Sequence, residues 1–421
     1  LFILYEFIYN FLMFRNFIYF IFLKIIIFLN SFIKIRFQEL QTRNIGHYSK
    51  SIEVYLSEVD CGLQLSYKFD FWIKNKSVAN TFLLKKLREK INILPSAFFF
   101  GFLKYIKENN HRKLLIPYKH PDLYENKEWH LVNANIFKNL DQWHFYDINK
   151  VLNKTQSKIK LTEKENTEFK SVLNLVNKNK LNEKIVLFYA RDKKYRGLQH
   201  EKEDLMNWRN TDINSYLKAM NLMAEKKYSV IRMGKFMEKK LSTDNPSIID
   251  YPFSNICRDY MDIYLCSTCK FGIFDSGGFN AVPCLFRKPL GLVNIAHLRE
   301  IKNRNDGTTP LIIFKKIFSE KLGRVLSFSE YEKYEVYKNL LDADFKRNGL
   351  KVLDNSAEDV YFFTQEAEKK FNNLRKEEYL TKDEIDLQKQ AKKILKDLNY
   401  GDLNFIDIGH KFLSNNKNLL Q

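Results

Sequence analysis

Short apolar runs alternate with helical patterns between Lys184 and Asn294, and no other feature constrains the fold of this sequence as strongly. The runs typical of strands are Lys184–Ala190, Ser229–Met233, Phe271–Phe274 and Pro289–Asn294. The helical patterns between them are Ile213–Lys226, Asp259–Ser267 and Asn280–Phe286. Uninterrupted apolar runs favour strands buried on both faces, and the helices between them supply the crossovers of a parallel sheet. The alternation therefore predicts an α/β fold with a doubly wound parallel sheet.

An earlier part of the chain shows a weaker form of the same pattern. Its strand-type runs are Ser51–Leu56, Phe69–Ile73 and Lys113–Pro117, and its clearest helical pattern is Ala79–Ile91. Because 421 residues are more than one hydrophobic core usually organises, we expect two domains. We predict two Rossmann-like doubly wound parallel-sheet domains, an N-terminal one at residues 35–149 and a C-terminal one at residues 184–328.

Two polar regions flank the predicted C-terminal domain. Residues 150–183 are rich in Lys, Asn, Thr and Glu, which predicts a linker. Within it Thr162 and Glu165 have the spacing of a capping box, so the linker is expected to carry a helix. Residues 329–421 are highly charged, and their pattern predicts a helical region at the end of the chain.

Residues 1–34 are dominated by Phe, Ile, Leu and Tyr and predict a hydrophobic membrane-associated helix. The densest part, Phe17–Leu29, is interrupted only by Lys24. Inserting one charge near the centre of a membrane helix costs about 2.5 to 3.5 kcal/mol, whereas each large apolar residue lowers the free energy of insertion by about 0.3 to 0.6 kcal/mol. Over this part of the chain the two contributions nearly cancel. A window of spanning length also takes in Arg15, which leaves a true span, an in-plane helix and a buried soluble helix all open.

The balance of charge favours an anionic partner. The chain has 69 Lys and Arg against 50 Asp and Glu, a net charge of +19. A nucleotide or an acidic lipid surface fits this balance, whereas no nucleic-acid-binding motif is visible, so no nucleic-acid partner is expected. Lys34, Arg36 and Arg43 follow the apolar segment, and the positive-inside tendency then places the rest of the chain at the cytoplasmic face of the inner membrane.

Several familiar motifs are missing from the sequence. Neither G-x-G-x-x-G nor G-x-x-x-x-G-K-[ST] occurs, which argues against a classical NAD enzyme and a P-loop NTPase. Cys266 and Cys269 form a C-x-x-C without a second ligand pair at zinc spacing, so buried free thiols are expected. Asp342 and Asp344 form a D-x-D that lies in a charged helical stretch and not at a strand end. We therefore predict neither a metal nor a cofactor.

Polar residues follow or close three of the predicted strands of the C-terminal domain. They are Arg191 and Asp192, Arg232 and Gly234, and the turn Ser276-Gly277-Gly278. Ligands of open α/β sheets bind beyond the carboxyl ends of the strands. Paired glycines let a backbone approach a ligand closely, and a diphosphate fits such a turn before a helix. Arg191, Arg209 or Arg232 is expected to neutralise its charge, although the glycines alone are also explained by an ordinary turn.

His47 is the candidate catalytic residue. It lies in the stretch R-N-I-G-H just before the run Ser51–Leu56, which is predicted to be a strand. A histidine near a cleft can act as a general base on an acceptor hydroxyl, although lone histidines are more often structural.

Several segments together resemble a poorly characterised bacterial family of glycosyltransferases that is associated with surface-polysaccharide synthesis. They are IRFQELQTRNIGHYSKSIEVYL (Ile35 to Leu56), FYARDKKY (Phe188 to Tyr195), RNTDINSYLKA (Arg209 to Ala219), VIRMGK (Val230 to Lys235) and DYMDIYLCSTCKFGIFDSGGFNAVPCLFRKPLGLVN (Asp259 to Asn294). The resemblance runs from about Ile35 to Asn416, which is nearly the whole chain beyond the apolar segment.

The turn at Ser276 and Gly277 is also similar to the Asp-Ser-Gly loop of heptosyltransferases, which have the GT-B fold. This resemblance implies a GT-B architecture with the donor in the C-terminal domain and the acceptor in the N-terminal one. It also implies that the donor diphosphate is lined by Arg191, Arg232, Ser276, Gly277 and Gly278. The chain has Asn280-Ala281 where heptosyltransferases carry His-Leu-Ala, which leaves the donor sugar open.

The predicted function is therefore glycosyl transfer from a nucleotide-sugar donor to a surface-polysaccharide or lipid-linked saccharide acceptor, by a metal-independent hexosyl- or related transferase. Fixed positive groups would assist departure of the nucleoside diphosphate. Two alternatives remain: transfer of another group to a glycan, such as pyruvyl transfer, and a non-catalytic scaffold that binds glycans or membranes.

Overall fold

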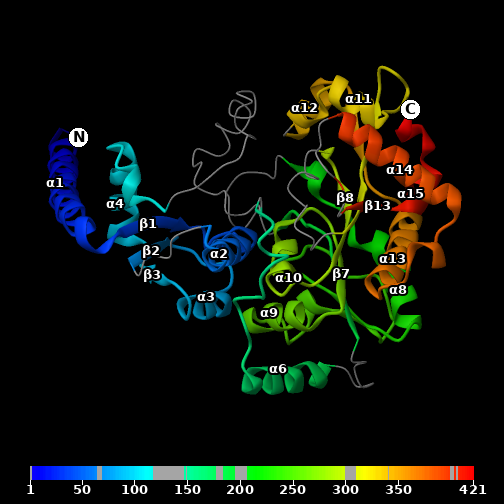
Figure 1. Cartoon of the computed structure of the whole chain (residues 1–421), viewed down its shortest axis with the longest axis horizontal. Coiled ribbons are helices and arrows are strands. Elements are labelled where there is room, and N and C mark those ends of the chain that lie inside the picture. Colours follow the sequence, from blue (N-terminus) through cyan, green and yellow to red (C-terminus); the bar gives the residue numbers. More distant parts are fainter. Residues whose placement is uncertain are drawn as a thin grey trace. The chain divides into compact units, whose positions relative to one another are not determined.

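The computed structural model describes residues 2–63, 69–116, 147, 149–176, 184–194, 206–298, 310–339, 341–398, 403 and 406–421. The chain divides into two compact units, residues 1–145 and residues 146–421 (Figure 1). Each unit contains a parallel sheet, which confirms the predicted α/β class.

The first unit is built on a three-stranded parallel sheet in the order β1-β2-β3. Its strands are β1 (Ile35–Leu40), β2 (Phe69–Lys74) and β3 (Asn92–Leu94). Its helices are α1 (Phe2–Ile33), α2 (Ile45–Asp60), α3 (Thr81–Arg88), α4 (Ala97–Glu108) and the short η1 (Arg112–Leu114). Leu115 adds one parallel bridge to Phe37, and Pro117 lies outside the described residues.

The strand predicted at Ser51–Leu56 is wrong, because these residues lie inside the 16-residue helix α2. Tyr48, Ile52 and Tyr55 are spaced for one helical face and are all buried, whereas the short run alone has the composition of a strand. The true first strand, β1, follows the apolar segment so closely that the prediction did not separate the two.

A buried polar cluster joins the strands and helix of this unit. Arg36 pairs with Asp70 of β2 through two hydrogen bonds, Nε to Oδ1 at 2.7 Å and Nη2 to Oδ2 at 2.5 Å. Tyr55 of α2 donates its hydroxyl to the same carboxylate, and burial raises the pKa of this tyrosine. The charge of Arg36 is therefore neutralised inside the unit, and its side chain does not face a lipid surface. Arg36 thus no longer supports the predicted orientation at the membrane, for which it was one of three basic residues.

The second unit contains a seven-stranded sheet in the order β13-β9-β8-β7-β4-β5-β6, and every neighbouring pair in it is parallel. The strands are β4 (Ile185–Tyr189), β5 (Ser229–Arg232), β6 (Ile248–Asp250), β7 (Phe271–Phe274), β8 (Leu290–Ile295), β9 (Leu311–Phe314) and β13 (Asp407–Ile408). The predicted doubly wound parallel sheet is thus confirmed. Four of its strands match the predicted runs.

Helices cover the sheet on both faces, α9 (Asp259–Thr268) and α10 (Ala281–Leu285) on one side and α8 (Leu217–Glu225) and α13 (Ala357–Phe371) on the other (Figure 1). The predicted capping box is present at α6 (Glu163–Val176): Thr162 and Glu165 exchange backbone-to-side-chain hydrogen bonds of 2.8 and 3.2 Å. Phe169 of α6 stacks on Tyr260 of α9, so this helix packs within the second unit.

Residues 329–421 are not purely helical. Helices α12 (Asp342–Arg347), α14 (Lys382–Asp397) and α15 (His410–Asn415) are present, with α11 (Phe328–Lys333) just before them. However, β12 (Leu350–Leu353) joins a small antiparallel sheet with β10 (Lys316–Ser319) and β11 (Arg324–Val325), and β13 pairs with β9 in the large sheet. The end of the chain is therefore part of the α/β core of the second unit.

Candidate functional site

The strand order of the large sheet reverses between β4 and β7. From β4 the chain adds β5 and β6 on one side, and from β7 it adds β8 and β9 on the other. The helices that follow these two strands diverge at such a switch point, which is where open parallel sheets bind ligands. Arg191 comes two residues after β4, and Asp275 comes directly after β7. Both residues therefore lie at the switch point.

Asp275 connects the loops that follow these two strands. Its carboxylate is almost fully buried and accepts hydrogen bonds from the backbone N–H groups of Arg191 and Gly277, the latter at 2.9 Å. Burial raises the pKa of Asp275 to about 6, against the opposing effect of these hydrogen bonds and of nearby Arg191 and Lys315. The carboxylate thus fixes the start of the Ser276-Gly277-Gly278 turn to the end of β4.

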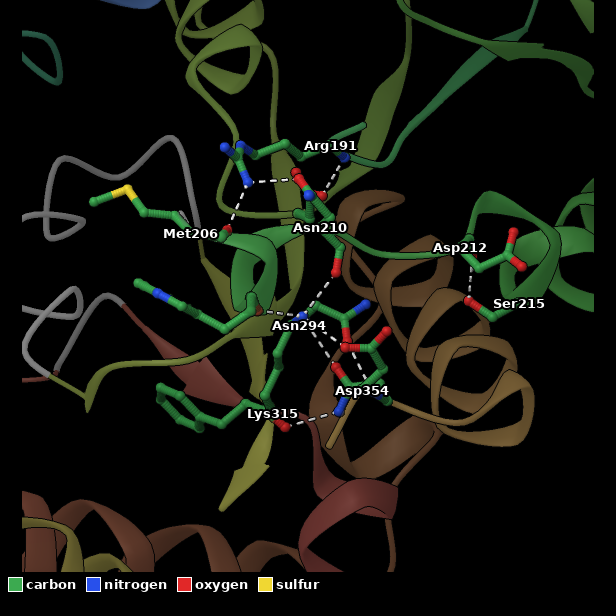
Figure 2. Close-up of polar contacts among 12 residues, drawn as sticks. Arg191, Met206, Asn210, Asp212, Ser215, Asn294, Lys315 and Asp354 are labelled. Carbon is green, nitrogen blue, oxygen red and sulfur yellow. Dashed lines mark hydrogen bonds and ion pairs between the residues drawn. The ribbon is translucent and has the colours of Figure 1, made fainter. Parts of the chain in front are cut away.

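Two buried cations fix the segment 206–210 over the same edge of the sheet (Figure 2). Arg191 donates from Nη1 to the carbonyl of Met206 at 3.1 Å and to Oδ1 of Asn210 at 2.5 Å. Lys315, which follows β9, donates from Nζ to the carbonyls of Trp208 and Asn210 at 2.8 and 3.1 Å. The segment contains the short helix η3 (Asn207–Arg209). The backbone carbonyls of Met206, Trp208 and Asn210 thus accept hydrogen bonds from two positive side chains.

Lys315 also forms an ion pair with Asp354, at 2.6 Å from Oδ1. Burial lowers the pKa of Lys315, and Asp354 and Asp275 oppose that effect. A buried lysine that pairs with a carboxylate and two carbonyls holds its position rigidly, because leaving any of these groups unpaired in a low-dielectric interior is costly.

Arg209 brings a positive side chain to the glycine turn. Its Nη2 donates to the carbonyl of Ser276 at 2.9 Å, and the residue is half-buried. Gly277 lies tightly under this turn, because an added Cβ would stand 2.6 Å from Cε1 of Tyr189. Gly278 is exposed and begins the short helix η6 (Gly278–Asn280). The turn is therefore packed against Tyr189 at Gly277 and exposed at Gly278.

Aromatic side chains pack against Trp208 of η3. Trp208 packs against His297 and Phe345 with ring centroids 4.7 and 5.6 Å apart. Asp342, at the start of α12, accepts the backbone N–H groups of Asn207 and Trp208 at 2.8 and 2.9 Å. As predicted, the D-x-D of Asp342 lies in a helix, and its first carboxylate has this structural partner.

Polar contacts fix the end of strand β8. Asn294 has a left-handed backbone with φ of 58°, next to an irregularity in the pairing with β9. The backbone N–H of Asn294 donates to Oδ1 of Asn355, and the backbone N–H of Asn355 donates to Oδ1 of Asn294, each at 2.7 Å. Nδ2 of Asn294 also donates to the hydroxyl of Tyr216 at 3.1 Å. Burial raises the pKa of that tyrosine well above its usual range. The end of β8 is therefore fixed by neutral amide contacts.

The predicted donor-site residues separate into two groups. The structure brings Arg191, Arg209, Ser276 and Gly277 together at the switch point, with Gly278 on the exposed side of the turn.

Arg232 lies elsewhere, on the β5–β6 side of the sheet. It is 1% exposed, pairs with Asp250 at 2.9 Å, donates to the carbonyl of Lys239 at 2.7 Å and lies over the ring of Phe253. Because its charge is already neutralised in the interior, we correct the expectation that Arg232 lines the diphosphate.

Asp192 and Gly234 belong to the loops after β4 and β5. Asp192 accepts the backbone N–H groups of Lys194 and Glu238 at 2.8 and 3.0 Å and so connects these loops. Gly234 has φ of 140°, a conformation that side-chain-bearing residues rarely adopt, and a Cβ there would overlap Met237. Both residues have a local structural role in shaping the loops.

His47 lies in the first turn of α2, directly beyond the carboxyl end of β1. It is half-buried, and the structure assigns it to the first unit. Its predicted catalytic role remains a prediction.

Sequence reasoning missed several residues of this site, above all Lys315, Asn210 and Asp354. The available signal was the apolar run Leu311–Phe314, which Lys315 follows directly. Arg191 likewise follows the predicted apolar run that ends at Ala190. The carboxylate of Asp275 was contained in the predicted loop but was not singled out.

The two cysteines of the C-x-x-C are buried free thiols, as predicted. Cys266, Cys269 and Cys284 are buried free thiols, and burial raises the pKa of Cys266 well above its usual range. Within the described ranges no group of three or more His, Cys, Asp or Glu side chains is placed to hold a metal ion.

No protein-family model matches the sequence, and a search of curated proteins gives no match. Among solved structures the chain is similar to the ADP-heptose LPS heptosyltransferase II of E. coli, with 9% identity, a TM-score of 0.39, and coverage of 67% of this chain and 90% of that one. It is also similar to a family 9 glycosyltransferase of Veillonella parvula (10% identity, TM-score 0.41, 79% and 96% covered). A third similar structure is the wall teichoic acid polymerase TagF (13%, 0.29, 80% and 89%).

Proposed function

We propose that this protein is a metal-independent glycosyltransferase that binds a nucleotide-sugar donor at the switch point of its second unit. The acceptor in this proposal is a surface-polysaccharide or lipid-linked saccharide. The observation that carries the proposal is that the side chains of Arg191 and Lys315 fix the segment 206–210, from which Arg209 reaches the turn after β7.

The most exposed cation of this cluster suits a diphosphate. Three nearby carboxylates, those of Asp275, Asp354 and Asp342, are already engaged by backbone N–H groups or by Lys315. Arg209 is the most exposed of the cations and already donates to the carbonyl of Ser276. Its guanidinium is therefore the group best placed to meet the diphosphate in a fork.

In the proposed reaction the acceptor oxygen forms a bond to the anomeric carbon of the sugar. The bond from that carbon to the diphosphate oxygen breaks, and the nucleoside diphosphate departs with the electron pair. Fixed positive groups stabilise the developing negative charge without reorganisation. The acceptor proton passes to a general base, for which we propose His47.

Titration calorimetry with ADP, GDP, CDP and UDP tests the donor site. The wild-type protein should bind one of them, and Arg209→Gln should weaken that binding at least tenfold, which corresponds to about 1.4 kcal/mol. Arg324→Gln is the matched control, because Arg324 is an exposed arginine that pairs with Glu330 in the same unit, on β11. Failure of all four nucleotides to bind would favour a non-catalytic scaffold. Equal losses in both variants would remove Arg209 from the site.

Two measurements test the chemistry. Activity with the nucleotide sugar that binds should survive EDTA, and strong inhibition that added Mg²⁺ or Mn²⁺ reverses would refute metal independence. The mass increase of the acceptor should be that of a sugar residue, whereas a pyruvyl mass would point to the alternative transferase. His47→Gln should lower kcat by about 10² to 10⁴ with a small change in donor affinity.

We also propose that the N-terminal segment holds the chain at the cytoplasmic face of the membrane. Its support is the window Leu12–Ile33, 22 residues with a mean hydropathy of 2.0, long and apolar enough to cross a bilayer.

A further inference from the structure

Large exposed apolar side chains are concentrated on the helices α1 and α4. The most exposed on α1 are Phe14, Phe17, Phe28 and Phe32, at 58 to 72%, and α4 adds Phe98 and Phe100, at 37 and 38%. Only 17% of the window Leu12–Ile33 is buried. A soluble protein rarely exposes an apolar surface of this size, so this surface, the α1–α4 surface, calls for a partner.

Helix α4 packs against the middle of α1 and not against its end (Figure 1). Tyr19 and Phe22 of α1 contact Phe98 and Phe102 of α4, with ring centroids 5.1 Å apart for Tyr19 and Phe98 and 4.7 Å for Phe22 and Phe102. Gly101 of α4 allows this approach, since a Cβ there would overlap the Tyr19 hydroxyl. Phe98 is in contact and exposed at the same time, so it continues the apolar surface from one helix to the other.

This packing argues against a helix α1 that crosses the bilayer. A crossing by Leu12–Ile33 would place Tyr19 and Phe22 near the middle of the hydrocarbon, and α4 with them. Lys104 and Glu108 of α4 are 73 and 59% exposed and form an i,i+4 pair at 3.5 Å. Charged side chains in that position are costly and normally face a protein interior or an aqueous cavity.

Helix α4 also packs against the sheet of the first unit. Phe102 also packs edge-to-face on Phe37 of β1, at 5.6 Å. Strand β1 begins two residues after α1 ends, with Lys34 between them in a left-handed conformation. No flexible connection therefore separates the sheet from the apolar helices.

We propose that α1 and α4 form one docking surface that lies in the plane of a lipid bilayer, with neither helix crossing it. This proposal rests on the membrane association proposed above. Arg15 lies 5.8 Å from the ring of Tyr19, and Lys24 lies 5.3 Å from the ring of Phe20, so both cations stay next to aromatic rings at the surface. Aromatic rings beside basic side chains match the interface between acyl chains and anionic headgroups.

Labelling of single cysteines determines the orientation of α1. Asn10→Cys and Lys34→Cys, each in the full chain with Cys61→Ser and Cys257→Ser, are treated with a membrane-impermeant maleimide. Both positions are exposed in the structure. An in-plane helix leaves both cysteines reactive in inside-out vesicles and unreactive in spheroplasts. Reaction of Asn10→Cys only in spheroplasts would show a span and would overturn the proposal.

Vesicle sedimentation tests the contribution of α4. The double variant Phe98→Ser/Phe100→Ser should bind vesicles of 30% phosphatidylglycerol and 70% phosphatidylethanolamine at least fivefold more weakly than the wild type. Leu175→Ser is the control: this leucine is 82% exposed on α6, and its loss should change binding less than twofold. Equal binding by wild type and double variant would overturn the role of α4.

A wild-type protein that does not bind these vesicles would overturn the membrane association itself. Concentration-dependent dimers that the double variant abolishes would then identify a second copy of the chain as the occupant of the surface. Neither result would bear on nucleotide binding in the second unit, which is measured separately.

Discussion

Replacement of Arg232 by methionine separates a structural role from a role in donor binding. Methionine keeps much of the apolar stem but removes the pair with Asp250 and the hydrogen bond to the carbonyl of Lys239. Breaking a buried pair costs about 3 to 5 kcal/mol. The Asp250 side chain is 21% exposed and keeps its bond from the Leu241 N–H, so we expect about 3 kcal/mol, the lower end of this range.

Differential scanning calorimetry and nucleotide titration on the same preparations provide the assay. A loss of about 3 kcal/mol corresponds to a fall in Tm of about 6 °C for a unit of this size. Affinity for the nucleoside diphosphate should stay within about twofold of wild type, because no described contact joins Arg232 to the glycine turn. The double variant Arg232→Met/Asp250→Leu should recover part of the loss. A tenfold loss of affinity with an unchanged Tm would refute the reasoning and return Arg232 to the site.

Three further predictions concern the second unit. The pKa of Asp275 in the folded protein is raised to about 6, so its contribution to stability is fully present below about pH 4 and is lost as the pH rises through 6. The free energy of unfolding of the wild type relative to Asp275→Asn should therefore fall by about 3 kcal/mol between pH 4 and 7 in denaturant titrations. A rise would contradict this. Gly277→Val should weaken nucleotide binding, since its Cβ meets the Tyr189 ring, and Tyr189→Ala should partly restore it; wild-type affinity in Gly277→Val would exclude the turn. Burial alone would raise the pKa of Asp407, but Lys370 and other lysines outweigh it and hold that pKa well below its usual range. Its stabilising contribution is therefore present above about pH 4 and lost in more acidic solution, and Asp407→Asn should flatten the acid limb of a Tm–pH curve.

The parallel sheet could be predicted because its information is local. Strands β4, β5, β7 and β8 are short apolar runs buried on both faces, and a window of a few residues contains the whole signal. Strand β13 could not be found in this way, because its two residues become a strand only by pairing with Leu311 and Ile312. Helix α2 was misread for a related reason: six of its residues have strand-like composition, and only the longer window shows a helical face.

The site could be predicted only in part, since a sequence shows which side chains follow a strand but not what they meet. Arg191 follows one apolar strand and Arg232 closes another, so the two look equivalent in the sequence. Arg191 is drawn to the segment 206–210, whereas Arg232 is neutralised by Asp250, eighteen residues further on. Lys315 was missed because a lysine after a strand is usually solvated, and its burial depends on carbonyls more than one hundred residues earlier.

Strand β13 has a consequence for the synthesis of the protein. Its partner β9 leaves the ribosome roughly 90 residues earlier, which at 5 to 20 residues per second is a wait of about 5 to 20 s. During that interval the far edge of β9 has unpaired N–H and C=O groups, a template for pairing with another nascent chain. Chains that stop before Asp407 would keep this edge open permanently, so premature termination should yield aggregates and not a shorter folded protein.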